Sequence, residues 1–181
     1  MCQRMSLKHY WMILVISVAT AIGLNNLLLL IDLAKYSEAY QKAAEILYAP
    51  SFVEQILITG MVVPVMEELI FRGLAFKLLR RWIPFTWAMI ASAVSFGVYH
   101  GNLVQFVYAT LCGLLLAYLY EVYGSILAPI MAHMVMNLTA VIMTEYGIFE
   151  WIFGNAISVL AVTVLCAVMW GVMFARIGKK S

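Results

Sequence analysis

Residues 103–123 read LVQFVYATLCGLLLAYLYEVY, a run of 21 residues in which Glu121 is the only charged side chain. At 1.5 Å per residue, a helix of this length is about 32 Å long, which matches the roughly 30 Å hydrocarbon core of a bilayer. We therefore expect it to span a membrane. Five further apolar runs are expected to do the same: residues 10–31, 52–79, 84–100, 126–143 and 148–177.

The composition of the whole chain agrees with a membrane-embedded fold. Of its 181 residues, 65% are hydrophobic and 11% are charged, whereas soluble domains have about 45–50% apolar and about 25% charged residues. A soluble domain of this length cannot cover so much apolar surface. The sequence predicts an all-α fold, a polytopic transmembrane helical bundle of about six spans that forms a single domain over residues 1–181.

Charge and cysteine content exclude two other classes of protein. The net charge of +2 is too small to indicate nucleic-acid binding, so no nucleic-acid partner is expected. The three cysteines, Cys2, Cys112 and Cys166, show no paired spacing, which excludes a disulfide scaffold.

A polar segment and a proline interrupt the apolar pattern. Residues 32–48 separate the first two runs, and their charged residues recur at helical spacing, which predicts a short interfacial helix. Within residues 52–79, Pro64 follows Gly60 by one turn, and we expect a kink there.

The basic residues predict the orientation of the bundle. Cytoplasmic loops of membrane proteins carry an excess of Lys and Arg. With a cytoplasmic N-terminus and six alternating spans, two basic residues lie outside and eight inside, so a multi-pass protein of the cell membrane with both termini cytoplasmic is expected. The outer ones are Lys35 and Lys42, and the inner ones are Arg4, Lys8, Lys77, Arg80, Arg81, Arg176, Lys179 and Lys180.

Three charges within residues 52–79 are costly in a bilayer. A charged side chain at the bilayer centre costs at least about 2.5–3.5 kcal/mol on insertion scales. Glu68 and Arg72 are four residues apart, so they share a helical face and are expected to pair. Glu67 points about 100° away from Glu68 and should either face a polar cavity or be partly protonated. The alternative is that all three only mark the cytoplasmic end of a long helix, since Lys77 is near.

Two histidines in other apolar runs complete the set of unusual polar residues. His100 ends the third run, and His133 lies in the fifth. Asn137 follows His133 by four residues, so both side chains point to the same side of their helix. A single histidine in a membrane helix often serves only as an interhelical hydrogen-bonding group. The concentration of such groups in three helices favours a functional site instead.

These residues form three ordered motifs: Glu67-Glu68-x-x-x-Arg72, Phe96-x-x-x-His100 and His133-x-x-x-Asn137. Together they resemble the CAAX prenyl endopeptidase and bacteriocin-processing (CPBP, or Abi) family of intramembrane proteases. The resemblance covers about residues 53–143, and the motif-bearing core is about residues 52–143. The first and last runs carry no family marker, and the chain is shorter than the eight-helix members that cleave prenylated proteins.

The resemblance implies an intramembrane endopeptidase that cleaves a membrane-associated or lipidated peptide or protein. It implies that Glu67 is the general base and that His100 helps to activate a water molecule. His133 and Asn137 then donate to the oxyanion, while Glu68 and Arg72 are structural or position the substrate. Donors aimed at developing charge act strongly where water is scarce.

The same residues also permit a zinc site, with Glu67, His100 and His133 as three ligands and one open position. Against it, the chain contains no His-Glu-x-x-His spacing, and asparagine is a poor zinc ligand. We favour a metal-independent site with no cofactor, and zinc remains the alternative.

The expected partners are a peptide or lipidated protein substrate and the lipid bilayer, with the catalytic cavity open toward the cytoplasm. Two other classes of function remain. A transporter also buries acids and histidines, but it predicts an internal repeat or paired half-helices, and none is visible in the sequence. A non-catalytic membrane scaffold or immunity protein is not excluded by an intact set of motifs.

Overall fold

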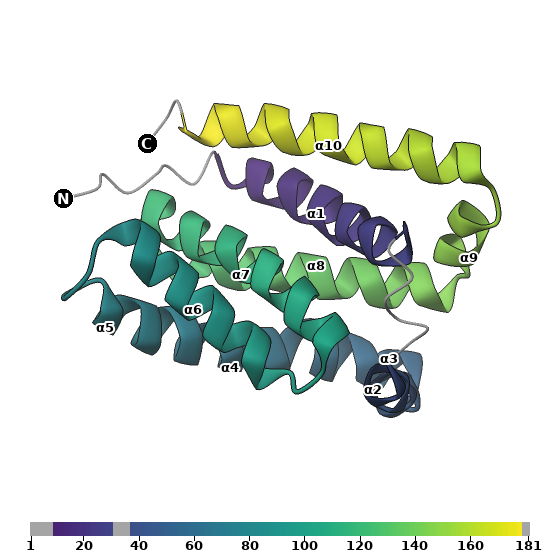
Figure 1. Ribbon diagram of the computed structural model, residues 1–181, viewed down its shortest axis with the longest axis horizontal. Coiled ribbons are helices and arrows are strands. Elements are labelled where there is room, and N and C mark those ends of the chain that lie inside the picture. The colour runs from purple at the N-terminus through teal and green to yellow at the C-terminus, as the bar shows by residue number, and fades with distance from the viewer. Residues whose placement is uncertain (1–8, 31–36, 179–181) are drawn as a thin grey trace.

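The computed structural model describes residues 9–30 and 37–178, and all regular secondary structure in these ranges is helical (Figure 1). Helices α3 to α5, including two π-helical stretches named η3 and η4, run without a break as one helix, Phe52–Leu79, here called the motif helix. The elements are α1 Trp11–Leu30, α2 Glu38–Tyr48, α3 Phe52–Glu54, η3 Gln55–Val62, α4 Val63–Glu68, η4 Leu69–Phe76, α5 Lys77–Leu79, α6 Phe85–Tyr99, α7 Leu103–Tyr123, α8 Leu127–Glu145, α9 Ile148–Phe153 and α10 Ala156–Gly178.

The long helices lie nearly side by side, with α10 along one edge of the bundle and the motif helix along the other (Figure 1). α1 packs against α8 and α10, and α6 packs against α7. α8 also contacts α7 and the η3 and α4 parts of the motif helix. The two sides of the bundle therefore meet at α8.

The main hydrophobic core lies between α1, α7, α8 and α10. It contains Met12, Ile16, Leu116 and Met136, each no more than 1% exposed. The outward faces carry exposed apolar side chains instead, among them Leu57, Leu69, Leu74, Leu160 and Leu165. Such faces suit contact with lipid tails, which are as apolar as leucine.

The span lengths agree with a polytopic membrane protein. Among the described residues, four helices are long and apolar enough to cross a membrane, namely α1, α7, α8 and α10. The number rises to five if α2 and the motif helix, bent by 103° at their junction, count as one span. α6 forms in the third predicted run, residues 84–100, but its 15 residues make it shorter than a full crossing requires.

The motif helix stays helical through Pro64, where the sequence predicts a kink. The turns just before the proline, η3, are π-helical, and the backbone N–H of Val63 bonds to Ile58 O, five residues back. Pro64 has no N–H to donate. The wider π register therefore leaves the carbonyl of Thr59, five residues before Pro64, without its backbone donor.

The predicted interfacial helix is present as α2, and the part of the expected segment at 32–36 lies outside the described residues. Ser37 caps its start by accepting from the N–H of Tyr40, and no residue of α2 is fully buried. Gln55 of the motif helix holds the corner that follows, because its Nε2 donates to Pro50 O at 2.9 Å and to Tyr48 O at 3.3 Å.

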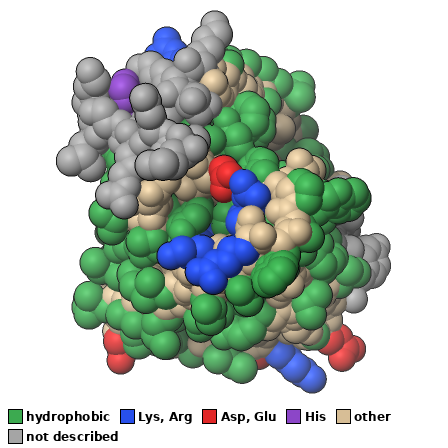
Figure 2. Space-filling model, turned by 90° about the vertical axis from the view of Figure 1, so that its left-hand side faces the viewer, with side chains coloured by type: hydrophobic (Ala, Val, Ile, Leu, Met, Phe, Trp, Pro, Cys, Tyr) green, Lys and Arg blue, Asp and Glu red, His purple; other side chains and the backbone are tan. Residues whose placement is uncertain are grey.

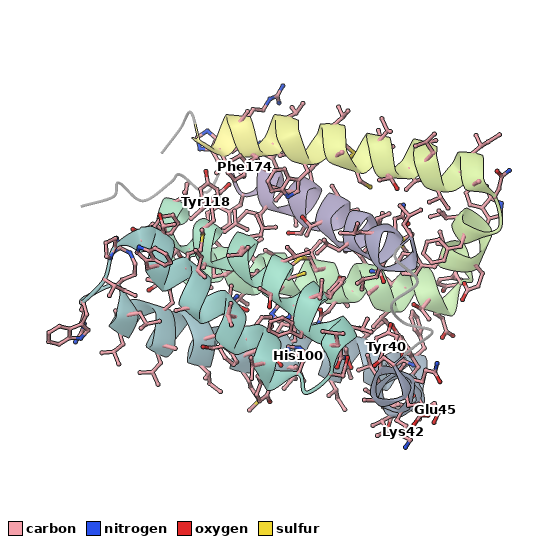
Figure 3. The ribbon with its side chains drawn as sticks, viewed as in Figure 1. Tyr40, Lys42, Glu45, His100, Tyr118 and Phe174 are labelled. Carbon is pink, nitrogen blue, oxygen red and sulfur yellow. The ribbon has the colours of Figure 1, made fainter. Side chains whose placement is uncertain are left out.

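The two ends of the bundle differ in charge. The start of α1, the end of α10 and the loop after α5 all lie at one end, here called the basic end (Figure 1). Its described basic residues are Lys77, Arg80, Arg81 and Arg176, and Figure 2 shows Lys and Arg side chains gathered there. Lys42 lies on α2 at the opposite end, here called the α2 end (Figure 3).

The close packing of α6 on α7 yields a stability prediction. A Cβ atom at Gly97 would meet Thr110 Oγ1 and would lie 2.7 Å from Phe106 O. Gly97→Ala should therefore overpack this contact and lower the free energy of unfolding by about 1–3 kcal/mol. The measurement is thermal unfolding of the detergent-purified protein.

Gly171→Ala in α10 is the matched control, because nothing lies within 4 Å of a Cβ atom there. It should leave stability unchanged or raise it by up to about 1 kcal/mol, since alanine is the better helix former. Equal unfolding midpoints for the two variants would contradict the tight α6–α7 contact.

Candidate active site

A fully buried ion pair lies in the motif helix. Arg72 Nη1 donates to Glu68 Oε1 at 2.8 Å, and both side chains are 0% exposed. The pairing at i and i+4 is the one that the sequence predicts. Burying two charges costs more free energy than their attraction typically returns. Among the described residues, Glu68 Oε2 and Arg72 Nε also lack a hydrogen-bond partner, so stability alone does not explain the pair.

The guanidinium of Arg72 is fixed by two neighbouring helices. Its Nη2 donates to Gly113 O of α7 at 2.9 Å, and its Cζ lies 4.7 Å from the centre of the Phe96 ring of α6. A Cβ atom at position 113 would lie 3.0 Å from Nη2. Glycine is therefore the residue that lets the guanidinium approach the α7 backbone.

Glu68 also fixes His133 of α8. His133 Nδ1 lies 2.9 Å from Glu68 Oε1, an oxygen that already accepts from Arg72. A carboxylate oxygen accepts, so Nδ1 carries the proton of this bond. His133 Nε2 then faces the other acid, at 3.7 Å from Glu67 Oε2, which is too long for a direct hydrogen bond.

His100 lies at the end of α6, where its backbone N–H bonds to Gly97 O. Its Nδ1 lies 2.8 Å from Phe96 O, and a carbonyl only accepts, so Nδ1 is the donor and Nε2 is left for other contacts. The Phe96 ring packs edge-on against both imidazoles, with ring centres 4.8 Å from His100 and 5.6 Å from His133.

Asn137 of α8 is held by the carbonyl that Pro64 leaves without a backbone donor. Its Nδ2 donates to Thr59 O at 2.9 Å. An asparagine amide has two N–H groups, so one remains for another acceptor. Backbone groups freed by proline in membrane helices are commonly satisfied by a neighbouring helix in this way.

These side chains line one cavity of about 290 Å³. Glu67, His100, His133 and Asn137 all face it, while Glu68 and Arg72 lie behind its wall. Glu67 is 12% exposed and has no closer ion-pair partner among the described residues than His133. The motif helix, α6 and α8 thus bring together the acid, the two imidazoles and the amide that the sequence singled out.

Other polar groups of the cavity were not singled out by the sequence. Asn25 of α1 and Gln105 and Tyr108 of α7 line it, together with Tyr40 of α2. Asn25 lies in the first apolar run, where it is not spaced to share a helical face with another of the motif residues. Asn25 reaches the cavity because the packing of α1 on α8 and α10 decides which face of α1 turns toward the cavity. No local sequence pattern encodes that choice.

The residues of the zinc alternative do not form a ligand set in this arrangement. Glu67, His100 and His133 border the same cavity. Among the described residues, however, no three His, Cys, Asp or Glu side chains are grouped closely enough to hold a metal ion. We therefore route no step of the reaction through a metal.

The cavity occupies the half of the bundle at the α2 end. Its lining includes Tyr40, Ala44, Leu47 and Tyr48 of α2 and the first half of α7, and none of the described basic-end residues Lys77, Arg80, Arg81 and Arg176. Figure 3 shows Tyr40 at this end and His100 nearer the middle of the bundle. The cytoplasmic basic end and the cavity open to the cytoplasm, both expected from the sequence, stay predictions.

Comparison with known proteins agrees with this combination of helices and motifs. The family described as "Type II CAAX prenyl endopeptidase Rce1-like" matches residues 49–139. The Bacillus subtilis (strain 168) protein described as "Putative membrane peptidase YdiL" is 38% identical over 88 residues. That match covers 49% of this chain and 36% of the relative. No solved structure matches.

The fold defines a polytopic membrane protein, and its motifs are those that resemble an intramembrane protease family. More narrowly, the chain belongs to the Rce1-like family of type II CAAX prenyl endopeptidases. The matched residues contain the motif helix, α6, α7 and the part of α8 that carries His133 and Asn137.

The buried ion pair predicts strong coupling between its two members. Arg72→Met and Glu68→Gln should each lower the free energy of unfolding by about 3–5 kcal/mol, because each leaves one buried charge without its partner. The glutamine keeps an oxygen acceptor for His133 Nδ1. The double variant should be less destabilised than the sum by about 0.5–3 kcal/mol. Chemical denaturation of the four proteins measures the cycle, and additive effects would contradict the pairing.

Proposed function

We propose that the protein is an intramembrane endopeptidase that hydrolyses a peptide bond of a membrane-associated or lipidated peptide or protein. One observation carries the proposal: Glu67, which has no hydrogen-bonded basic partner in the part of the chain that the structure describes, faces the same cavity as His100, His133 and Asn137. Carboxylate, imidazole and amide groups are those that peptide hydrolysis needs for proton transfer and oxyanion stabilisation.

In this proposal Glu67 is the general base that takes a proton from the attacking water. His100 helps to hold this water through Nε2, since its Nδ1 is bonded to Phe96 O. The water oxygen bonds to the scissile carbonyl carbon, and the proton moves by way of Glu67 to the leaving amine. A positioned base of this kind typically contributes 10²–10⁴-fold to the rate.

His133 and Asn137 are proposed to stabilise the oxyanion of the tetrahedral intermediate. The free N–H of the Asn137 amide and the Nε2 side of His133 face the cavity. Because Nδ1 already carries a proton, His133 donates from Nε2 in its imidazolium form. Glu68 and Arg72 act as positioning residues, because Glu68 Oε1 fixes the orientation of the His133 ring. Donors held in advance cost no reorganisation during the reaction.

The orientation proposed from the basic residues puts both termini in the cytoplasm and makes the protein a multi-pass protein of the cell membrane. The substrate is a peptide or lipidated protein that reaches the site from the bilayer. Prenylated CAAX proteins, peptide pheromones and bacteriocin precursors are the candidate classes to test. The proposal includes no resident cofactor.

The central prediction concerns Glu67→Gln, which keeps the shape of the side chain but removes the base. We expect cleavage of a candidate peptide in proteoliposomes to fall by at least about 10²-fold, with the unfolding midpoint unchanged. Glu121→Gln is the matched control, because Glu121 pairs with Arg80 outside the cavity and is 30% exposed. Full activity of Glu67→Gln would contradict the proposed base, and a phenotype independent of Glu67 would favour a non-catalytic scaffold.

Metal dependence has its own test. Exhaustive chelation followed by gel filtration should leave the rate of peptide cleavage unchanged, because the proposed water activation uses side chains alone. Loss of activity that added Zn²⁺ restores would instead support Glu67, His100 and His133 as ligands. Glu67→Gln should be inactive in either case, so this measurement separates the metal question from the identity of the site.

A further inference from the structure

We infer that Asn25 of α1 and Gln105 of α7, here called the amide pair, bind the main chain of an extended peptide beside the reacting groups. The inference rests on the proposed function for the peptide nature of the ligand. Both amides line the cavity that Glu67, His100 and His133 border. The proposed mechanism uses neither of them.

The Gln105 amide is held so that its nitrogen stays free. Its Oε1 accepts from Nδ2 of Asn102, the residue that precedes α7. Asn102 Oδ1 in turn accepts from the backbone N–H of Gln105 at 2.9 Å, as an N-cap. Because a donor already binds Oε1, the two N–H groups of Nε2 remain, and no acceptor among the described residues takes either of them. Gln105 therefore presents donors to the cavity.

The Asn25 amide is held in the opposite sense. Its Nδ2 donates to Ala21 O of the preceding turn at 2.8 Å, which fixes the side chain against its own helix. Within residues 9–30 and 37–178 no donor binds Asn25 Oδ1, so this atom remains as an acceptor. Asn25 also lies outside residues 49–139, which match the family model. Its presence in the cavity is therefore a feature that the family match does not cover.

A free donor and a free acceptor together fit a peptide main chain. Each residue of an extended peptide, proline apart, offers one N–H and one C=O whatever its side chain. Burying these groups without partners costs free energy. Much of the cavity lining is apolar, with Leu28, Val104 and Met136 as examples, and supplies no such partner. The amide pair supplies both kinds, so it suits peptides of different sequence and discriminates little between their side chains.

Asn102→Asp tests the donor without a change in the cavity lining, to which Asn102 does not belong. Aspartate is an equally good N-cap, so the start of α7 is kept. Its carboxylate cannot donate to Gln105 Oε1, so we expect the Gln105 amide to turn, donate to the carboxylate and point its oxygen into the cavity. A peptide carbonyl would then meet an oxygen in place of a donor.

The probe is the pentapeptide dansyl-Ala-Leu-Ala-Leu-Ala amide, whose binding to the full-length protein in lipid nanodiscs is followed by fluorescence anisotropy. Every protein in the comparison carries Glu67→Gln to prevent cleavage, and empty nanodiscs give the background. Asn102→Asp is compared with Gln105→Met, which keeps the backbone N–H that Asn102 caps. Gln41→Met is the matched control, because Gln41 lies on α2 outside the cavity lining.

We expect Asn102→Asp and Gln105→Met each to raise the dissociation constant of the probe about 2–10-fold, the effect of one lost hydrogen bond. Gln41→Met should leave the dissociation constant unchanged. The inference would be overturned by unchanged affinity in either of the first two variants, by an equal loss in Gln41→Met, or by the absence of saturable binding to the Glu67→Gln protein.

The acceptor has a separate test. Four analogues of the probe each replace one internal amide by an ester, which removes a single N–H. We expect at least one ester to bind about 2–10-fold more weakly than the amide probe when Asn25 is present, and Asn25→Leu to abolish that difference. Four esters that all bind like the amide probe, or a difference that persists in Asn25→Leu, would overturn the role of Asn25.

These binding measurements do not depend on catalysis. If the affinities change as expected but the protein with Glu67 intact cleaves no peptide, the amide pair is supported and the proposed function is contradicted. If peptides are cleaved in a Glu67-dependent way but the affinities do not change, the proposed function is supported and the amide pair is contradicted.

Discussion

The arrangement of the site depends on a single oxygen atom, Glu68 Oε1. It accepts from Arg72 within the motif helix and from His133 of α8, and both bonds lie in the bundle interior. Because Arg72 also reaches Gly113 O of α7 and the Phe96 ring of α6, this one carboxylate ties four helices together. The neighbouring Glu67 is left to face the cavity. A costly buried charge is thus compensated by neighbours that also set the direction of the His133 ring.

A second constraint comes from Pro64. A proline within a membrane helix frees a backbone carbonyl, which has to find another donor. Here the π-helical turns place that carbonyl at Thr59, and the Asn137 amide donates to it. The bond fixes α8 against the motif helix one turn beyond His133. The same helix irregularity that the proline causes therefore fixes the amide proposed to stabilise the oxyanion.

The sequence predicts the features that depend on neighbouring residues of one helix, but it does not predict the contacts between side chains of different helices. The all-α bundle, the Glu68–Arg72 pair and the shared side of His133 and Asn137 follow from hydropathy and from the period of the helix. The contact of Glu68 with His133, 65 residues away, depends on how α8 packs on the motif helix, and no local spacing encodes it. The opening of the cavity toward the cytoplasm stays a prediction, because the basic residues alone say nothing of which end of the bundle is hollow.

The most direct test is an experimental structure of the protein in a lipid nanodisc with a peptide phosphonate, whose tetrahedral oxygens imitate the intermediate. We predict that one phosphonate oxygen lies within hydrogen-bond distance of Asn137 Nδ2 and His133 Nε2, with the Glu67 carboxylate against another. Phosphonate bound away from these groups, or a Glu67 side chain turned outward to the lipid, would contradict the account.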